Sequence, residues 1–111
     1  VEGETRVEAV QLAGGERIAS DWVGVGTGVA PTVGWLAGSG VEVRRGVAVD
    51  AHLRTSADGV WAAGDCAELR SPPPGVPPSR PIWYTAREQG AVAGLGMAGL
   101  ARAYAPGVYF N

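Results

Sequence analysis

The chain has 111 residues, of which 46% are hydrophobic and 18% are charged, and its formal net charge is −2. A chain of this length forms one domain or parts of two, and its apolar content is too high for a disordered protein. The slightly acidic balance gives no footprint for nucleic acid, and no apolar run is long enough to span a membrane. The single cysteine excludes an internal disulfide and fits a reducing, cytoplasmic setting.

The N-terminal third begins with an extended pattern. Residues 6–12 alternate polar and apolar side chains, residues 13–15 form a glycine-containing turn, and residues 16–19 resume the extended pattern, which predicts a β-hairpin. Residues 21–26 (DWVGVG) then predict a buried strand with a glycine-rich end. Glycines at such an end let backbone N–H groups approach a dinucleotide or a flavin; the alternative is a plain loop.

The middle of the chain predicts short elements. Residues 32–37 are expected to form a short helix, and residues 41–43 and 46–50 two short strands. His52 has no second histidine or nearby cysteine to complete a site, so it is expected to be a surface residue. The sequence therefore predicts no metal site.

The stretch around which the chain is organised is residues 55–69 (TSADGVWAAGDCAEL). A turn precedes the apolar run 60–63, which predicts a buried strand of a parallel sheet. Gly64 and Asp65 then fall at the carboxyl end of that strand, where open α/β sheets bind their ligands. The alternative is a strand that simply runs into an Asp-containing turn.

The C-terminal third contains a proline-rich loop, residues 71–81, and one long helical segment, residues 82–101. Small residues recur along that helix and predict a smooth face for close packing, formed by Ala86, Gly90, Ala93 or Gly94, and Met97. Residues 94–99 match the string GxGxxG, but they lie near the end of a helical pattern rather than after a strand, so they do not predict a dinucleotide site. Four glycines in this segment cost about 3–4 kcal/mol relative to alanine, which only packing against another element can offset.

The stretch TSADGVWAAGDCAE resembles the second flavin-binding motif of the FAD-dependent pyridine nucleotide-disulfide oxidoreductases, and the segments on both sides follow the same order. The resemblance implies that Asp65 hydrogen-bonds a ribityl hydroxyl of FAD, with Gly64 beside it. The segment from Gly24 to Pro31 resembles the turn that closes the NAD(P)H-binding domain, so that Gly24, Gly26 and Gly28 would line the nucleotide-side cleft and Pro31 would lead back to the FAD domain.

The segment WYTAREQG, residues 83–90, resembles the aromatic-x-x-A-x-x-Q-G helix of the same family. The resemblance implies that the helix N-terminus faces the flavin ring, where unpaired N–H groups would stabilise negative charge on the reduced ring. Trp83 and Tyr84 would flank the ring; the alternative is an aromatic pair that packs the helix onto the sheet. The pair Arg44 and Arg45 is most simply a solvated turn, and contact with the 2′-phosphate of NADPH is the alternative.

The expected fold class is α/β: a fragment of a two-dinucleotide-domain, FAD- and NAD(P)-binding fold, with a β-hairpin, short buried strands and one long C-terminal helix. The expected boundaries are 1–31 for the end of the NAD(P)H-binding domain, 32–103 for the closing segment of the FAD-binding domain, and 104–111 for the start of a C-terminal interface domain. The chain lacks a GxGxxG that follows a strand, so its partner in folding would be the missing N-terminal half or another copy of the chain.

Two functions follow as hypotheses. In the first, the chain is part of a flavin-dependent oxidoreductase that passes electrons from NAD(P)H through FAD to an acceptor, such as an electron-acceptor protein. It would then bind cofactor without supplying a catalytic acid, base or nucleophile, and the 111 residues alone would be inactive. In the second, the chain is a non-catalytic module that folds by oligomerising or by docking onto a partner chain.

Overall fold

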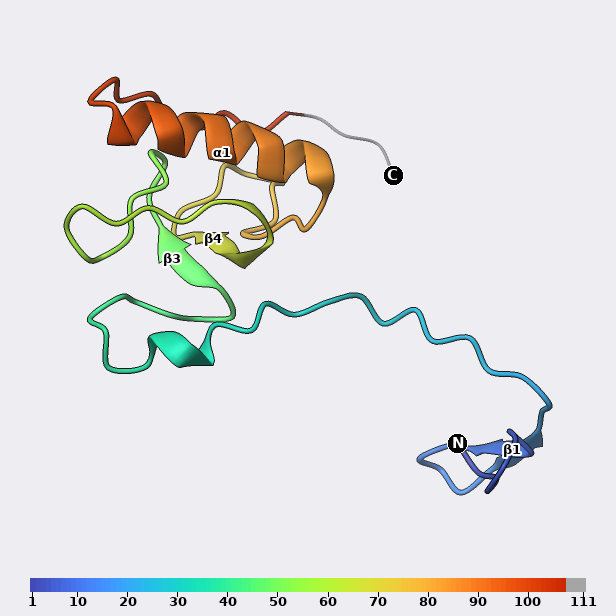
Figure 1. The fold of residues 1–111 in the computed structure, drawn as a ribbon. Helices are drawn as coiled ribbons and strands as arrows, with labels where there is room; N and C mark the ends of the chain where they lie inside the picture. Colours follow the sequence, from blue (N-terminus) through green and yellow to red (C-terminus); the bar gives the residue numbers. More distant parts are fainter. Residues whose placement is uncertain (108–111) are drawn as a thin grey trace.

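A computed structural model describes residues 1–107 (Figure 1). A small antiparallel hairpin lies at one end of the molecule, and a compact part with two parallel strands and one helix lies at the other. In Figure 1 the helix runs along one side of the parallel strands, and the short turn η1 lies on their other side. The elements are β1 (Ala9–Gln11), β2 (Arg17–Ala19), η1 (Gly34–Leu36), β3 (Val47–Val49), η2 (Gly64–Cys66), β4 (Ala67–Leu69) and α1 (Trp83–Met97).

The two parts are joined by an extended connector, residues 20–32 (Figure 1). The radius of gyration is 19.1 Å, whereas a compact domain of this length has a radius of about 13 Å. The strand predicted for residues 21–26 is wrong: these residues form no strand, and Trp22 and Val25 are 80% and 78% exposed. A strand needs a neighbour to accept its backbone hydrogen bonds, and no described segment lies beside the connector in that way.

The hairpin at residues 6–19 is confirmed. β1 and β2 pair antiparallel, with Val10 opposite Ile18. Two backbone hydrogen bonds close the turn: the Leu12 N–H donates to the Glu16 carbonyl, and the Gly15 N–H donates to the Leu12 carbonyl. Gly15 takes the left-handed conformation, at φ +87°, that glycine adopts without strain. An ion pair of 2.8 Å joins Arg17 to Glu2 on the same hairpin. The bonds that hold the hairpin are therefore local.

The strand predicted at residues 46–50 is confirmed as β3, but its parallel partner is not the predicted one. β3 pairs with β4, with Val47 opposite Ala67 and Val49 opposite Leu69. The predicted strand at residues 60–63 is wrong, because Trp61 makes only a single antiparallel bridge, to Arg54. The predicted strand at 41–43 is likewise reduced to one bridge at Val43. Residues 53–62 instead fold back on themselves, with the Ala62 N–H donating to the Leu53 carbonyl at 3.1 Å.

The core gathers around β3 and β4. Leu53 is fully buried there although its φ is +60°, which is unfavourable for a branched side chain. Asp50 stabilises this conformation, since its Oδ1 accepts hydrogen bonds from the N–H groups of His52 at 2.8 Å and Arg54 at 2.9 Å. The core consists of Val33, Val47, Val49, Leu53, Ala67, Leu69, Val92, Ala93 and Tyr104.

The long C-terminal helix is confirmed, over a shorter range. α1 ends at Met97, where Gly99 adopts φ +79° and the Leu100 N–H donates to the Leu95 carbonyl at 2.9 Å, a Schellman cap. Gly99 therefore caps the helix rather than lying inside it. Three glycines remain within α1: Gly90, Gly94 and Gly96.

The buried face of α1 matches the predicted one only in part: Ala93 is buried as predicted and Ala86 lies beside the Gly64 turn, but the other predicted positions are not buried. Gly90, Gly94 and Met97 are exposed, whereas the face that packs on the core carries Thr85, Gln89, Val92 and Ala93. The sequence pattern does not predict the whole of this face, because glycine and alanine give almost no hydrophobic contrast around a helix. The proline-rich residues 71–81 form no helix or strand, as predicted.

Tyr104 holds the chain against the core after α1. Its N–H donates to the Ala51 carbonyl at 2.7 Å, and its side chain is buried. The predicted start of an interface domain at residues 104–111 stays a prediction, and its residues 108–111 lie outside the described residues. Burial raises the pKa of the Tyr104 phenol above its ordinary value of 10.0, and the neighbouring Thr85 hydroxyl opposes this effect.

We expect the folded chain to lose stability in alkali through Tyr104. Because the folded state holds the phenol proton more tightly than the unfolded state, its stabilisation is complete below the unfolded pKa and is lost as pH rises through the raised pKa. All nine cationic side chains are arginines, so no lysine titrates in this range. The free energy of unfolding in urea at about pH 9 and about pH 11 measures the effect. Tyr104→Phe should reduce the loss, and a variant that loses as much stability as the parent chain would contradict this expectation.

Candidate functional site

The site is built around the turn that carries Gly64 and Asp65. Gly64 has φ +81°, a conformation that side-chain-bearing residues rarely adopt. The turn packs directly on α1: a Cβ at Gly64 would lie 3.4 Å from the Ala86 Cβ. The Gly64 N–H also donates a 2.8 Å hydrogen bond to Oε1 of Gln89. Two residues of one helix face therefore fix the turn, and Asp65 extends from it with an exposed side chain.

A cavity of about 360 Å³ lies beside Asp65. Two of its lining residues, Ser79 and Pro81, come just before Ile82, which occupies the N-cap position of α1. Asp65 therefore faces a hollow that reaches toward the start of the helix. The cavity is lined by Val29, Ala30, Pro31, Arg45, Gly46, Asp65, Ser79 and Pro81.

The position of this cavity corrects one expectation. Gly46 directly precedes β3, and the Gly64–Cys66 turn directly precedes β4. The hollow therefore lies at the amino ends of this parallel pair and not at the carboxyl end of a 60–63 strand. The physical reason is that the ladder forms after Asp65, from Ala67–Leu69, and not before it.

Charges of both signs line the cavity and its rim. Arg45 and Asp65 are the charged residues in the wall, and both side chains are exposed. Arg44 instead pairs with Glu42 at 2.8 Å, as the solvated-turn interpretation predicts. The contact of either arginine with NADPH stays a prediction. Cys66 follows Asp65, and its thiol donates to the Ala63 carbonyl at 3.4 Å, so it packs rather than forming a disulfide.

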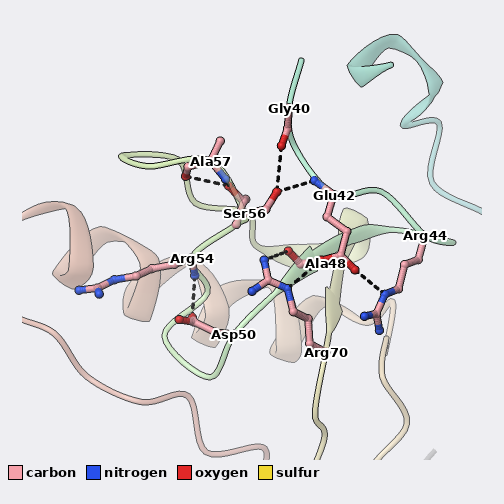
Figure 2. A network of polar contacts seen from close by, with 10 residues as sticks. Gly40, Glu42, Arg44, Ala48, Asp50, Arg54, Ser56, Ala57 and Arg70 are labelled. Carbon is pink, nitrogen blue, oxygen red and sulfur yellow. Dashed lines mark hydrogen bonds and ion pairs between the residues drawn. The ribbon is translucent and has the colours of Figure 1, made fainter. Parts of the chain in front are cut away.

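A polar network holds the 40–46 loop, whose last two residues, Arg45 and Gly46, line the cavity (Figure 2). The Ser56 hydroxyl accepts from the Glu42 N–H at 2.6 Å and donates to the Gly40 carbonyl at 3.1 Å. The Glu42 carboxylate lies between the guanidinium groups of Arg44 and Arg70, which are 2.8 Å and 3.3 Å away. These groups are partly exposed, so each ion pair contributes little to stability, about 0–1 kcal/mol. The network orients the 40–46 loop more than it stabilises the fold.

Trp83 and Tyr84 begin α1 and are 67% and 59% exposed. Their rings meet edge to face with centroids 5.3 Å apart, and the Arg87 guanidinium lies 5.6 Å from the Trp83 ring centre. The pair therefore does not pack the helix onto the sheet, which removes that alternative. No side chain caps the helix N-terminus at Ile82. The first N–H groups of α1 are therefore not satisfied by a capping side chain.

The structure joins some predicted site residues and separates others. Pro31 lines the same cavity as Asp65, although the two are far apart in the sequence. Gly24, Gly26 and Gly28 lie along the extended connector outside this cavity, and open space surrounds the Cβ positions of Gly26 and Gly28. Their role at a nucleotide-side cleft stays a prediction. Among residues 1–107, no three acidic, histidine or cysteine side chains group as metal ligands, and no helix is long and apolar enough to cross a membrane.

Residues 1–90 match the family described as pyridine nucleotide-disulphide oxidoreductase. The chain belongs to this family. The match spans the hairpin, the connector, the Gly64–Asp65 turn and the first half of α1, so the resemblance noted in the sequence is confirmed. The family's enzymes depend on FAD and use NAD(P)H.

The relatives of this pyridine nucleotide-disulphide oxidoreductase chain include a dehydrogenase subunit and several reductases. The chain is 41% identical over 88 residues to the epsilon subunit of an NADH-dependent phenylglyoxylate dehydrogenase from Aromatoleum evansii. The aligned residues cover 79% of this chain and 21% of that subunit. The chain is 39% identical over 66 residues to a rubredoxin-NAD(+) reductase from Ectopseudomonas oleovorans, covering 60% of this chain and 17% of that protein.

Solved structures agree with the family assignment. The chain overlays a ferredoxin reductase from Rhodopseudomonas palustris with a TM-score of 0.78 and 31% identity, over 95% of this chain and 26% of that one. An NADH:rubredoxin oxidoreductase from Clostridium acetobutylicum overlays 77% of the chain with a TM-score of 0.65 and 28% identity. The chain spans about a fifth of the length of these relatives.

Sequence reasoning missed several cavity residues and the contact made by Gln89. Gly46, Ser79 and Pro81 reach the cavity from segments that carry no motif of their own, and Arg45, named in the sequence only as an alternative contact of NADPH, lines it as well. Gln89 was part of a recognised motif, but its spacing of 25 residues from Gly64 gives no sign of a hydrogen bond. The sequence signal that could have indicated this contact is the presence of both motifs in one chain, the GD turn and the A-x-x-Q-G helix.

Proposed function

We propose that this chain supplies the ribityl and flavin-ring contacts of an oxidoreductase that passes electrons from NAD(P)H through FAD to an acceptor. The observation that carries the proposal is the placement of Asp65 on a cavity that also includes Pro31 and the residues that lead into α1. FAD, when bound, would accept a hydride from NAD(P)H and release electrons singly or in pairs.

The described residues fit part of such a cofactor. The Asp65 carboxylate is an exposed acceptor suited to a sugar-alcohol hydroxyl. The N-terminus of α1 carries no capping side chain, and the N–H groups at such a helix end suit a polar edge of the ring. The chain supplies no binding loop for the pyrophosphate of FAD, because the sequence has no glycine-rich loop between a strand and a helix. Those contacts would come from outside this chain.

Each residue of the site would have a binding role only. Asp65 would hold the ribityl chain, Gly64 would let the turn adopt its conformation, and the start of α1 would oppose negative charge on the reduced ring. Pro31 would close the cavity from the connector side. Gly24, Gly26 and Gly28 would lie on the nucleotide side. An acceptor such as a small electron-transfer protein agrees with the rubredoxin and ferredoxin named for the relatives.

The second candidate is a non-catalytic module that folds onto a partner chain or another copy. The exposure of Trp22 and Val25 on the connector favours it, because a tryptophan left 80% exposed has surface that a partner would cover. The two candidates differ in whether the cavity binds flavin.

The proposal is tested in a chimera. The R. palustris ferredoxin reductase receives this chain in place of the segment that it overlays, so the missing parts of the fold are present. We expect a purified chimera with bound flavin absorbance. Asp65→Ala should raise the Kd for FAD about 30-fold, because a hydrogen bond to a charged group contributes about 2 kcal/mol.

The matched control is Asp58→Ala, at an exposed aspartate on the preceding loop that does not line the cavity. It should leave FAD affinity unchanged. A chimera that folds without flavin, or an Asp65→Ala chimera that binds FAD as tightly as the parent, contradicts the proposal. A colourless chain that forms stable oligomers supports the second candidate.

A further inference from the structure

Gln89 is the buried polar residue that connects the two motifs of the site. Its side chain is 3% exposed, yet its Oε1 accepts the Gly64 N–H at 2.8 Å across 25 residues of sequence. A buried amide that forms such a bond is costly to leave unpaired on either side, because both groups have been removed from water. The bond is therefore a fixed link between the turn and the helix.

The hydrogen bond from Gly64 to Gln89 acts at the first residue of the turn, directly before Asp65. Gly64 opens the 3-10 turn that carries Asp65, and the residue before it, Ala63, makes no side-chain capping hydrogen bond. Gln89 thus satisfies the first N–H of the turn from outside. Ala86, about one helical turn earlier on the same face, also lies next to the turn, since a Cβ placed on Gly64 would be 3.4 Å from the Ala86 Cβ.

Together these contacts determine how the turn is placed against α1. The hydrogen bond ties the turn to Gln89, and the closeness of Ala86 shows that the turn packs against the helix at this point, with no more than van der Waals space for a Cβ at position 64. Asp65 lies one residue after the fixed point, and the start of α1 lies two turns before Gln89 on the same helix. The separation between the Asp65 carboxylate and the helix N-terminus therefore depends on Gln89.

We propose that Gln89 is a positioning residue of the flavin site, which fixes the Gly64–Asp65 turn on α1 and so sets the place of the Asp65 carboxylate relative to the start of the helix. The inference rests on the proposed role of Asp65 in binding FAD. Gln89 itself would touch no cofactor, because its side chain is enclosed between the helix and the turn.

The first measurement is amide hydrogen exchange at Gly64 in the chimera without added FAD. Gln89→Met keeps the length of the side chain and removes the acceptor, and it should speed exchange of the Gly64 amide about tenfold relative to its neighbours, which corresponds to about 1.4 kcal/mol. Gln89→Asn keeps an amide but is one methylene too short, so it offers a second variant should the Met variant fold poorly. Val92→Ala, at a buried position on the same helix face, is the control and should not single out Gly64.

The second measurement is a double-mutant cycle on FAD affinity. Gln89→Met alone should raise the Kd for FAD about tenfold, and in an Asp65→Asn background it should raise it by less than about threefold, because the carboxylate that it positions is gone. A residue with a merely structural role gives the same factor in both backgrounds, as Val92→Ala should. Equal factors for Gln89→Met, or unchanged Gly64 exchange, overturn the inference.

The two ideas fail in different ways. An Asp65→Asn chimera that binds FAD like the parent, while Gly64 exchange still responds to Gln89→Met, overturns the proposed function and leaves the turn-fixing contact standing. Asp65→Asn with weak FAD binding and a Gly64 amide indifferent to Gln89 overturns the positioning role and leaves the proposed function standing.

Discussion

Replacing Leu53 with alanine should lower the free energy of unfolding by about 3 kcal/mol, the middle of the range for a fully buried leucine. Leu53 has no exposed surface and lies in the cluster formed by β3, β4 and α1. Alanine leaves a cavity there and keeps the unfavourable φ of +60°, so nothing in the backbone offsets the loss. Because small domains are stabilised by only about 5–15 kcal/mol, the variant should show a much earlier transition in urea.

Tryptophan fluorescence is a suitable signal for this experiment, since Trp61 packs against the core. Leu100→Ala is the matched control, because the Leu100 side chain is mostly exposed after the end of α1. It should change the free energy of unfolding by less than about 0.5 kcal/mol. Equal effects of the two substitutions would contradict the description of the core.

Replacing Gly46 with alanine should destabilise the chain by about 2–3 kcal/mol, as expected when a methyl group is forced into a packed position. A Cβ at Gly46 would lie 2.6 Å from the Cys66 carbonyl oxygen, which is backbone and cannot swing away. The Gly46 N–H also donates a 2.8 Å hydrogen bond to Oε2 of Glu68, so moving position 46 breaks a contact with β4. The clash therefore separates β3 from β4 at the ends that border the cavity.

Urea denaturation of Gly46→Ala and Gly34→Ala measures this effect. Gly34 lies in η1 with no atoms near its would-be Cβ and no left-handed φ, so its substitution should be close to neutral. In the chimera, Gly46→Ala should also weaken FAD binding, because Gly46 lines the cavity beside Asp65. A Gly46→Ala chain as stable as the Gly34→Ala chain would show that the strands are not packed as described.

The sequence predicts most of the local elements correctly where the signal is local. Alternation and a glycine turn are sufficient for the β1–β2 hairpin, because its hydrogen bonds join residues close in the chain. The position of α1 follows from its helical pattern, and Gly99 supplies the stop. These features need no knowledge of distant residues.

The errors arise where pairing is long-range. The apolar run at 60–63 has the composition of a buried strand, but the ladder forms at Ala67–Leu69, where the charged Glu68 interrupts the apolar pattern. Glu68 is tolerated there because its carboxylate accepts the Gly46 N–H. Residues 21–26 have a strand's composition too, but a strand forms only where a neighbour can pair with it. Composition indicates which segments favour a strand, and hydrogen bonding to a neighbouring segment decides which of them form one.

The candidate site divides in the same way. Asp65 and Gly64 were found by their motif, and the resemblance to the pyridine nucleotide-disulphide oxidoreductases is confirmed by the match over residues 1–90. Gly46, Ser79 and Pro81 join the cavity only through folding, so no spacing in the sequence could reveal them. The bond from Gln89 to Gly64 belongs to the same class of information.

The extended connector has a consequence for cooperativity. The hairpin at one end satisfies its own hydrogen bonds, and an isolated two-stranded hairpin is at best marginally stable in water. Residues 33–107 hold a core of their own, centred on Leu53 and β3. Heating this chain should therefore not give a single all-or-none transition: the hairpin melts first and gradually, and the helix-bearing part unfolds later as a unit.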